Sequence, residues 1–256
     1  TLAEHGWNLY CPDHRGHGAS MDAADPPGHF ADQDGWRLVM DDLGRVIDGI
    51  REREPGALVL GGHSMGSFIA LAGAQAHGDK LDGLVLCGSD YHPPLYYRLM
   101  AALLKWQRRR HGARGQSPLV HKLTFEAWAR SVPDARTDFD WLSADPAQVK
   151  AYIDDPKCGF QCTTATWLAL LSGLADVQSS KGLSRLPARL PILLLGGRQD
   201  PMSGGGKGMD RLQQVLSRRR LPVERMDCPR GRHEILNDFC APEVRQTLLE
   251  WLNRRI

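Results

Sequence analysis

Apolar positions along the chain follow two patterns. Short continuous runs are typical of buried strands, and recurrence at helical spacing is typical of helices. Short apolar runs bounded by turn residues predict strands at residues 7–11, 57–60, 81–87, 191–197 and 222–228. Apolar residues at helical spacing predict helices at residues 36–54, 67–74, 209–220 and 242–254. Strands that alternate with helices in this way indicate an α/β protein with a mostly parallel sheet flanked by helices.

The rhythm changes between residues 90 and 185, which contain helical patterns but no convincing pair of strands. Helices are expected there at residues 95–110, 119–130 and 163–177. A long inserted segment that is not a linker is usually functional, so we interpret this one as a cap over a site. The domain organisation is therefore a core of residues 1–89 and 186–256, with a helical cap of residues 90–185 inserted before the strand at 191–197.

The first residues have the pattern of the tail of a helix. Residues 1–6 end in Gly6, and glycine favours the left-handed conformation that closes helices. Farther on, residues 12–20 are dense in polar and turn-forming residues. We interpret this loop as a hydrogen-bonded corner in which Asp13 can pair with Arg15, rather than as the margin of a site.

Composition narrows the class of protein. Of the 256 residues, 42% are apolar and 24% are charged, as in soluble globular proteins, and the net charge of +2 gives no argument for nucleic-acid binding. The longest apolar stretches are far shorter than a membrane span. The cysteines are Cys11, Cys87, Cys158, Cys162, Cys228 and Cys240. Cys158 and Cys162 are four residues apart, but no second pair of cysteines or histidines completes a zinc site with them. We interpret all six cysteines as reduced thiols of a cytoplasmic protein. The chain begins with Thr1, so a targeting sequence cannot be read.

One pentapeptide stands between a predicted strand and a predicted helix and carries candidate chemistry. Residues 62–66 read Gly-His-Ser-Met-Gly, the G-x-S-x-G pattern of a nucleophile elbow. We therefore predict Ser64 as a nucleophile and the backbone N–H of Met65 as a donor to an oxyanion. We expect a Cβ at Gly62 or Gly66 to press against a neighbouring strand or helix. The alternative is an ordinary strand-to-helix turn with a capping serine, which explains Ser64 but not both glycines.

A serine nucleophile needs a base and an acid that orients the base, and two later loops offer them. Asp200 follows a predicted strand, and His233 lies between the last strand and the last helix. With Ser64 they have the chain order serine, acid, histidine of the α/β-hydrolases, and we predict them as a catalytic triad. His63 neighbours the serine but is expected to point away from it. Three rival acids are Asp227, Asp238 and Asp176.

Four motifs together point to a known family. They are Pro-Asp-His-Arg-Gly-His-Gly at 12–18, Gly-His-Ser-Met-Gly at 62–66, Asp-Pro at 200–201, and Gly-Arg-His-Glu at 231–234. With them the chain resembles the monoacylglycerol lipase and lysophospholipase branch of the α/β-hydrolases, a branch also grouped with serine aminopeptidase-like hydrolases. The resemblance runs from Thr1 to the end, and residues 155–160 also resemble the cap of its bacterial members.

This resemblance implies an α/β-hydrolase fold in which Ser64 is the nucleophile, Asp200 the acid and His233 the base. It implies no metal or cofactor. Ser67 departs from the family, which usually has a second glycine there. The family also begins with further strands and a His-Gly loop that supplies the second oxyanion donor, and these are absent here. We hypothesise that the sequence is part of a longer gene product, because losing one oxyanion donor costs on the order of a hundred- to thousand-fold in rate.

The resemblance further implies a serine ester hydrolase whose partner is a small lipid or ester, such as a lysophospholipid or monoacylglycerol. One alternative is a small-substrate peptidase or amidase, although the sequence shows no acidic pocket signature for a peptide amino terminus. Another is a catalytically silent hydrolase that serves as a binding module. The helix at 95–110 has a basic end, which indicates either peripheral membrane contact through the cap or a complement to the helix dipole. The pattern does not specify an oligomeric state.

Overall fold

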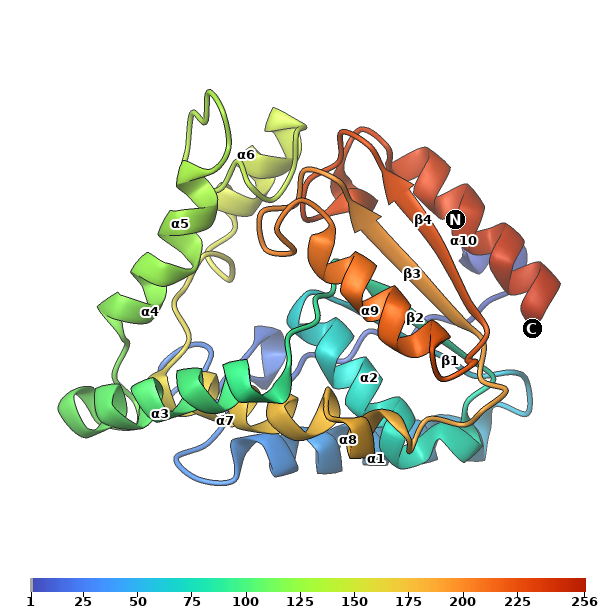
Figure 1. Ribbon diagram of the computed structural model, residues 1–256, viewed down its shortest axis with the longest axis horizontal. Coiled ribbons are helices and arrows are strands. Elements are labelled where there is room, and N and C mark those ends of the chain that lie inside the picture. The colour runs from blue at the N-terminus through green and yellow to red at the C-terminus, as the bar shows by residue number, and fades with distance from the viewer. Residues whose placement is uncertain (1) are drawn as a thin grey trace.

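A parallel sheet forms the centre of the molecule, and helices cover both of its faces. The structure is a computed structural model that describes residues 2–256. Within those residues the strands are β1 (Val59–His63), β2 (Gly83–Cys87), β3 (Ile192–Gly197) and β4 (Val223–Cys228), in the spatial order β1-β2-β3-β4 (Figure 1). Each neighbouring pair is parallel, which confirms the α/β class predicted from the sequence.

The predicted helices outside the insertion are present, with ends shifted by a few residues. They are α1 (Gly35–Arg53), α2 (Met65–His77), α9 (Lys207–Ser217) and α10 (Ala241–Arg255). In α1 the buried residues Val39, Leu43 and Ile47 recur every fourth position, which turns one face of this helix toward the core. The helix ends at the residue before Glu54, because Pro55 follows and disfavours helical backbone at the residue that precedes it.

Alternate side chains of the two central strands pack on opposite faces of the sheet. Leu84 of β2 and Ile192 of β3 belong to the core formed with α2 and α9. Their chain neighbours Val85 and Leu193 belong to the core formed with α10. Because both faces are covered, these strands consist almost wholly of apolar residues, and the pattern of the sequence is a continuous apolar run instead of an alternation.

The segment between β2 and β3 is helical, as expected, but its helices differ in detail from the prediction. They are α3 (Pro94–His111), α4 (Pro118–Leu123), α5 (Phe125–Arg130), α6 (Pro146–Asp154), α7 (Thr164–Val177) and α8 (Ser180–Leu183). The single helix expected at 119–130 is wrong, because Thr124 leaves the helical region (φ −115°, ψ −90°) and separates α4 from α5. The pattern also missed α6, which the side chain of Asp145 caps.

Two parts of this insertion lie differently relative to the core. The helices α4, α5 and α6 lie at the left of Figure 1, on the side toward which β3 and β4 point. By contrast, α7 packs both on α3 and on α1 of the core, and Gln178 just beyond it donates to the carbonyl of Asp90 at 2.8 Å. The division into a core and a cap at residues 90 and 185 therefore remains a prediction, since α7 contacts both parts.

The strand predicted at residues 7–11 is wrong. These residues form no strand, and Tyr10 and Cys11 are exposed. Within residues 2–256, β1 is the edge of the sheet and pairs only with β2, so the segment has no neighbouring strand with which to form a ladder. Side chains of the segment instead reach α1's end, where the hydroxyl of Tyr10 donates to Glu54 at 2.6 Å.

The predictions for the segments before and after residues 7–11 are confirmed in outline. A turn of 3-10 helix, Ala3–His5, closes on Gly6 with φ 84°, while Thr1 lies outside the described residues. Residues 12–20 form a corner in which Asp13 accepts a hydrogen bond from the N–H of Ala19 at 2.7 Å. The expected pair of Asp13 with Arg15 is wrong, because that carboxylate is used within the turn and Arg15 instead pairs with Asp42 of α1 at 2.7 Å.

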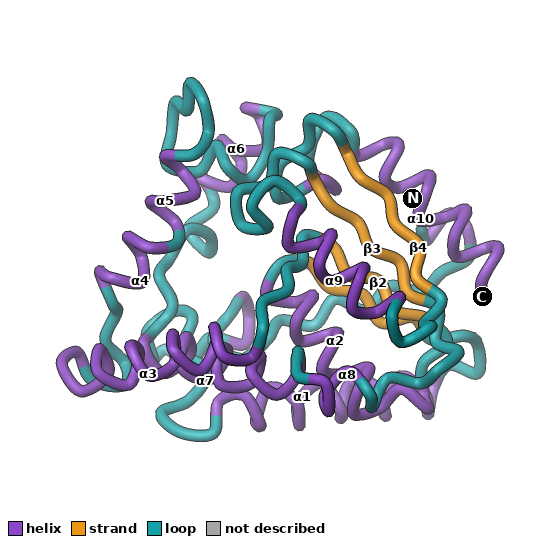
Figure 2. Tube along the Cα trace, viewed as in Figure 1, coloured by secondary structure: helices purple, strands orange, loops and turns teal. Residues whose placement is uncertain are grey.

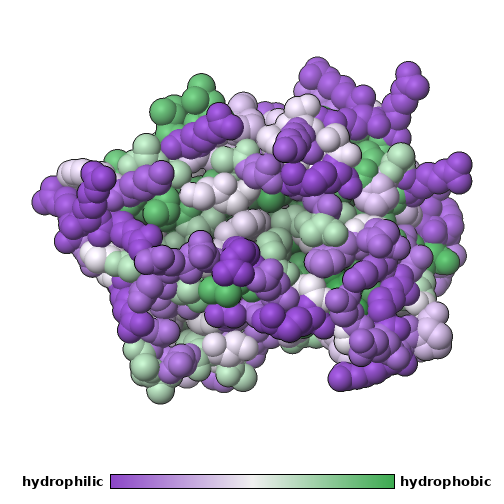
Figure 3. Space-filling view, turned by 90° about the horizontal axis from the view of Figure 1, so that it is seen from below, coloured by the Kyte–Doolittle hydropathy of each residue, from purple (hydrophilic) through white to green (hydrophobic). Residues whose placement is uncertain are grey.

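The surface carries charged residues between scattered apolar ones. The face seen in Figure 3, which looks onto the side of α1, α3 and α7 in Figure 1, is mostly hydrophilic with hydrophobic residues in separate groups. The tube in Figure 2 shows how much of the chain around the strands is helix or loop. Among residues 2–256, none of the helices combines the length and the apolar character needed to cross a membrane.

Candidate active site

The predicted nucleophile lies at a sharp turn between a strand and a helix. β1 ends at His63 and α2 begins at Met65, so Ser64 alone makes the connection. Its backbone has φ 53° and ψ −123°, a region that non-glycine residues rarely occupy. The N–H of Ser64 donates to the carbonyl of Cys87 at the end of β2, at 3.0 Å, which ties the turn to the neighbouring strand. This is the geometry of a nucleophile elbow, and strain of this kind clusters at functional sites.

The two glycines of the elbow have different roles. A Cβ on Gly62 would collide with the backbone carbonyl of Gly66, which explains why a glycine is required there. A Cβ on Gly66 would meet nothing within 4 Å beyond its own helix, so the expected crowding at that position is wrong. Ser67, the departure from the family pattern, is fully buried and its hydroxyl donates to the carbonyl of Ser64 at 2.6 Å. This side chain therefore braces the elbow from within the first turn of α2.

The predicted acid and base lie beside each other at the ends of β3 and β4. The Nδ1 atom of His233 is 3.2 Å from the Oδ2 atom of Asp200, and each residue is 1% exposed. The two atoms are within ion-pair distance, but their mutual angle is not that of a formed hydrogen bond. A buried carboxylate at Nδ1 of an imidazole can fix the tautomer that leaves Nε2 free to accept a proton.

The surroundings of Asp200 favour its charged form. Burial by itself would raise the pKa of this carboxyl, but the neighbouring His233 and the donors at Met202 and Ser203 outweigh it, and the net pKa lies below its usual value. The N–H of Met202 donates to Oδ1 at 2.9 Å. Asp200 is therefore ionised at neutral pH, as a group that stabilises an imidazolium must be.

The three rival acids have other partners. Asp227 pairs with Arg198 and Arg225, and Asp176 pairs with Arg185. Asp238 accepts hydrogen bonds from the backbone N–H groups of Arg232 and Ala144. None of the contacts of these carboxylates in residues 2–256 involves the side chain of His233. Asp200 is the carboxylate that the structure brings to this histidine.

Ser64 and His233 are not joined by a hydrogen bond in this structure. The hydroxyl of Ser64 points to the sulfur of Met202, with Oγ and Sδ 3.8 Å apart, and Nε2 of His233 is buried without a partner. Met202 thus covers the serine while its backbone N–H holds Asp200. Met202 was not predicted from the sequence, although its position two residues after the predicted acid was a usable signal.

His63 lies behind the base and not beside the nucleophile's hydroxyl. Its Nε2 atom is 3.0 Å from the carbonyl oxygen of His233, and the two rings are 4.7 Å apart. Burial, with a contribution from His233, lowers the pKa of His63 to about 4. His63 is therefore neutral at physiological pH, and its N–H donates to the backbone of the loop that carries the base. Gly88 (φ 54°) leaves room for both rings, since a Cβ there would lie 3.0 Å from His63.

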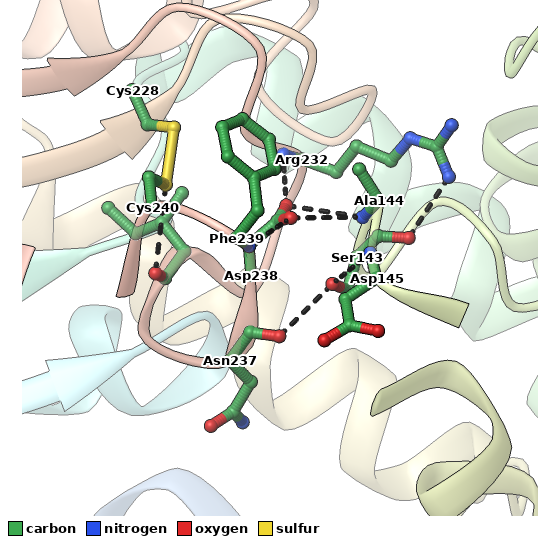
Figure 4. Close-up of a disulfide and its surroundings, with 10 residues drawn as sticks. Ser143, Ala144, Asp145, Cys228, Arg232, Asn237, Asp238, Phe239 and Cys240 are labelled. Atoms are coloured by element: carbon green, nitrogen blue, oxygen red, sulfur yellow. Dashed lines mark hydrogen bonds between the residues drawn. A yellow bond between two sulfur atoms is a disulfide. The ribbon is translucent and has the colours of Figure 1, made fainter. Parts of the chain in front are cut away.

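Residues of the inserted segment hold the base from the other side. The ring of Trp141 lies 5.2 Å from the ring of His233, and the carbonyl of Trp141 accepts the N–H of His233 at 3.3 Å. Figure 4 shows the neighbouring contacts, in which Asp238 receives N–H groups from Arg232 and from Ala144. Trp141 was not predicted as a contact of His233, because nothing in its local pattern indicates a partner more than 90 residues away.

A disulfide closes the loop that carries the base. Cys228 at the end of β4 and Cys240 before α10 are bonded, with their Cα atoms 6.5 Å apart (Figure 4). The prediction that all six cysteines are reduced is therefore wrong for this pair. Spacing along the chain gave no signal, because the two residues meet only when the loop between β4 and α10 folds back on itself. The free thiols are Cys11, Cys87, Cys158 and Cys162.

The fold, the elbow and the chain order of serine, acid and histidine define an α/β-hydrolase. The chain belongs to the serine aminopeptidase S33 family of hydrolases, because the model of that family matches residues 1–239. No curated protein matches the chain in sequence. The protein is thus a hydrolase of the branch indicated by the sequence motifs.

Solved structures share the fold of this chain. A thermostable carboxyl esterase from Bacillus coagulans, in complex with glycerol, matches with a TM-score of 0.85 and 25% identity over 95% of this chain and 79% of that chain. A lipase in an open form matches with a TM-score of 0.83 and 24% identity, over 94% of this chain and 79% of that one. The monoacylglycerol lipase of Paleococcus ferrophilus has the same fold, with a TM-score of 0.65 and 22% identity over 94% of this chain and 81% of its own.

Proposed function

We propose that the protein is a serine hydrolase that cleaves carboxylic esters. The single observation that carries this proposal is the strained backbone of Ser64 at the elbow, with the buried pair of Asp200 and His233 at the same edge of the sheet. The carboxyl ends of parallel strands form one edge, which is where open α/β sheets hold their sites.

The proposed reaction begins with rotation of the Ser64 hydroxyl away from Met202. His233 Nε2 takes the hydroxyl proton while Oγ attacks the ester carbonyl, and the oxyanion is stabilised by the N–H of Met65. That N–H belongs to the first turn of α2, where amide groups have no helical acceptor. The intermediate then expels the alcohol, which receives the proton from His233, and leaves an acyl group on Ser64. Water attacks this ester with His233 again as base, and the acid product leaves.

Monoacylglycerols and lysophospholipids are the substrate class that we propose. Two of the matched structures are named as a carboxyl esterase with glycerol and a monoacylglycerol lipase, and both share the fold described above. A peptidase or amidase uses the same three residues, as the name of the matched family illustrates. A silent binding module is the third reading, and it differs from both in that Ser64 would not react.

Labelling by a fluorophosphonate probe separates these readings, because only an activated serine reacts with it. We expect the purified protein to be labelled, Ser64→Ala to lose the label, and the exposed Ser217→Ala to keep it. A short-chain aryl ester and the matching anilide, offered side by side, then distinguish esterase from amidase. Absence of labelling would contradict the triad, and faster cleavage of the anilide would contradict the ester preference.

We also propose that α3 makes peripheral contact with a lipid surface. Its side chains Leu95, Leu99 and Trp106 are among the most exposed large apolar residues of the described chain. Its last turn is basic, and Arg110 lies over the ring of Trp106 at 4.9 Å. An exposed apolar stripe with basic neighbours suits the surface of an anionic membrane. Co-sedimentation with phosphatidylserine vesicles is expected to fall in Leu99→Ser and not in Leu9→Ser, and equal loss in both would contradict the proposal.

A further inference from the structure

A pocket in the inserted segment combines aromatic rings with acidic side chains. Its volume is about 200 Å³, and it lies between α5, α6 and the loop segments before and after α6. Aromatic and acidic side chains dominate its lining, and they are Phe125, Phe139, Tyr152, Phe160, Glu126 and Asp138. No lysine or arginine side chain of residues 2–256 lines it. The triad does not use this pocket, so its chemistry needs its own explanation.

The aromatic rings are held in fixed positions. Phe139 and Tyr152 have ring centroids 5.2 Å apart, inclined at 51°. Gly159 lies against both, since a Cβ there would be 3.3 Å from Phe139 and 3.8 Å from Tyr152, and its N–H donates to the Tyr152 hydroxyl at 3.1 Å. The backbone of Gly159 is left-handed, with φ 74°, so a larger residue there would be strained. The face of an aromatic ring is negative, so a cation that meets these rings face-on is attracted to them.

The charged side chains of the lining favour the same kind of ligand as the aromatic rings do. Within residues 2–256 Asp138 is exposed and forms no hydrogen bond or ion pair. Glu126 has an ion-pair partner, Arg130, at 3.2 Å along the exposed side of α5. Burial raises the pKa of Tyr152, so its phenol is uncharged at neutral pH, and Asp138 and Glu126 carry the negative charge of the lining. His121, which also lines the pocket, has a buried Nδ1 atom without a hydrogen-bond partner in residues 2–256.

We propose that this pocket binds an alkylammonium cation. Cations are attracted to aromatic faces within about 6 Å, and quaternary ammonium groups are commonly held by several rings together. An acyl chain fits less well, because it would bring hydrocarbon against two carboxylates and remove water from them. An anionic group would be repelled by the same carboxylates. The ligand is therefore an organic cation of small size.

Tilted ring contacts connect the lining of the pocket to the catalytic base. Phe125 lies 6.0 Å from Trp141, and Trp141 lies 5.2 Å from His233, measured between ring centroids. These contacts bring the lining of the pocket near the base, so we extend the proposal to an ester that has its carbonyl at Ser64 and its ammonium group in the pocket. This extension to the substrate rests on the proposed function, whereas binding of the cation itself does not. Two sources share the chemistry: a trimethylammonium head group and the amino terminus of a peptide or amino ester.

Direct binding measurements test the cation site without relying on catalysis. Calorimetric titration of the Ser64→Ala protein with choline is expected to give millimolar affinity. The neutral isostere 3,3-dimethylbutan-1-ol should bind at least tenfold more weakly, because it has the same shape without the charge. Asp138→Asn and Phe139→Leu should each weaken choline about three- to tenfold. Asp134→Asn, an exposed carboxylate in the same loop that does not line the pocket, should leave the affinity unchanged.

The outcomes separate the site from the function. Equal affinity for choline and its isostere, or no binding of either, overturns the cation site. Tighter binding of tetramethylammonium than of methylammonium indicates the head-group source, and the reverse order indicates an amino terminus, while both support the site. With the wild-type protein, a choline ester should have a lower KM than the 3,3-dimethylbutyl ester, and Asp138→Asn should abolish that difference. If choline binds but no ester is cleaved, the proposed function fails and the site stands.

Discussion

The proposed nucleophile, Ser64, and the proposed base, His233, are held in place in opposite ways. The elbow at Ser64 is made from consecutive residues, with Gly62 leaving space for the carbonyl of Gly66 and Ser67 bonded to Ser64 itself. The loop of His233 is held by distant parts of the chain. Its supports are His63 at the end of β1, Trp141 from the insertion, and a disulfide between Cys228 and Cys240.

This difference has a physical origin. An elbow needs only a strand, a helix and small residues in a tight turn, and steric exclusion acts between near neighbours in the chain. A base must meet both the acid and the nucleophile, so its loop depends on contacts that form only after the sheet is assembled. We therefore expect a substitution at the elbow to displace Ser64 directly. A substitution in the loop of His233 is expected to act indirectly, by weakening the contacts that hold this loop.

The largest effect is expected at Gly62. In Gly62→Ala the new methyl group meets the Gly66 carbonyl, which must move and take Ser64 with it. Since a displacement of about 1 Å can cost roughly a hundredfold in rate, we expect at least that loss in kcat/KM for an aryl ester. Gly66→Ala is the matched control, because its methyl group meets open space, and it should stay within a few-fold of the wild type. Equal losses in both variants would show that the elbow is not limited by this contact.

The next effect concerns pH and the support of the base by His63. Its pKa is about 4 when folded and 6.5 in its unperturbed state, so between these values the unfolded chain binds a proton that the folded protein does not. The free energy of unfolding should therefore fall by about 3 kcal/mol as the pH drops from 6.5 to 4. In His63→Gln, which keeps an N–H donor, that part of the decline should vanish. Urea unfolding at several pH values measures it, and the lowered pKa of Asp200 affects both proteins alike.

Removal of the disulfide tests how far the bond between the two ends of the His233 loop stabilises the protein. Cys228 and Cys240 are 12 residues apart, and closing a loop of that length is worth on the order of 2–3 kcal/mol. The double variant Cys228→Ser, Cys240→Ser should lose about that much stability, whereas Cys11→Ser, at an exposed free thiol, should lose little. Thiol titration of the denatured, unreduced protein should detect four groups. Six groups would contradict the bond.

The smallest effect is expected at Asp238, which joins the base loop to the inserted segment. In Asp238→Asn one acceptor is replaced by a donor that faces the N–H of Arg232 or Ala144. We expect kcat for an aryl ester to fall about tenfold with KM nearly unchanged, since the contact holds the base and does not touch substrate. Asp176→Asn, in an exposed pair with Arg185, is the control. A change in KM alone would assign Asp238 to binding instead.

Much of the fold could be read from the sequence. Strands such as β2 and β3 are continuous apolar runs, and α1 repeats its buried positions every four residues, so their existence follows from local pattern. The strand expected at 7–11 failed for a non-local reason, because a strand exists only when another strand pairs with it. The break at Thr124 and the helix α6 were missed because their signals are short.

The sequence by itself determined the family and the candidates for nucleophile, acid and base, because these depend on the order of motifs and on turn geometry that glycines dictate. The tertiary structure alone decided which carboxylate meets His233, that Met202 covers Ser64, and that Cys228 bonds to Cys240. It also decided that aromatic and acidic side chains from separate helices and loops share one pocket. The reason is the same in each case: these partners are far apart in the chain, and only the packing of the sheet and the inserted helices brings them within contact distance.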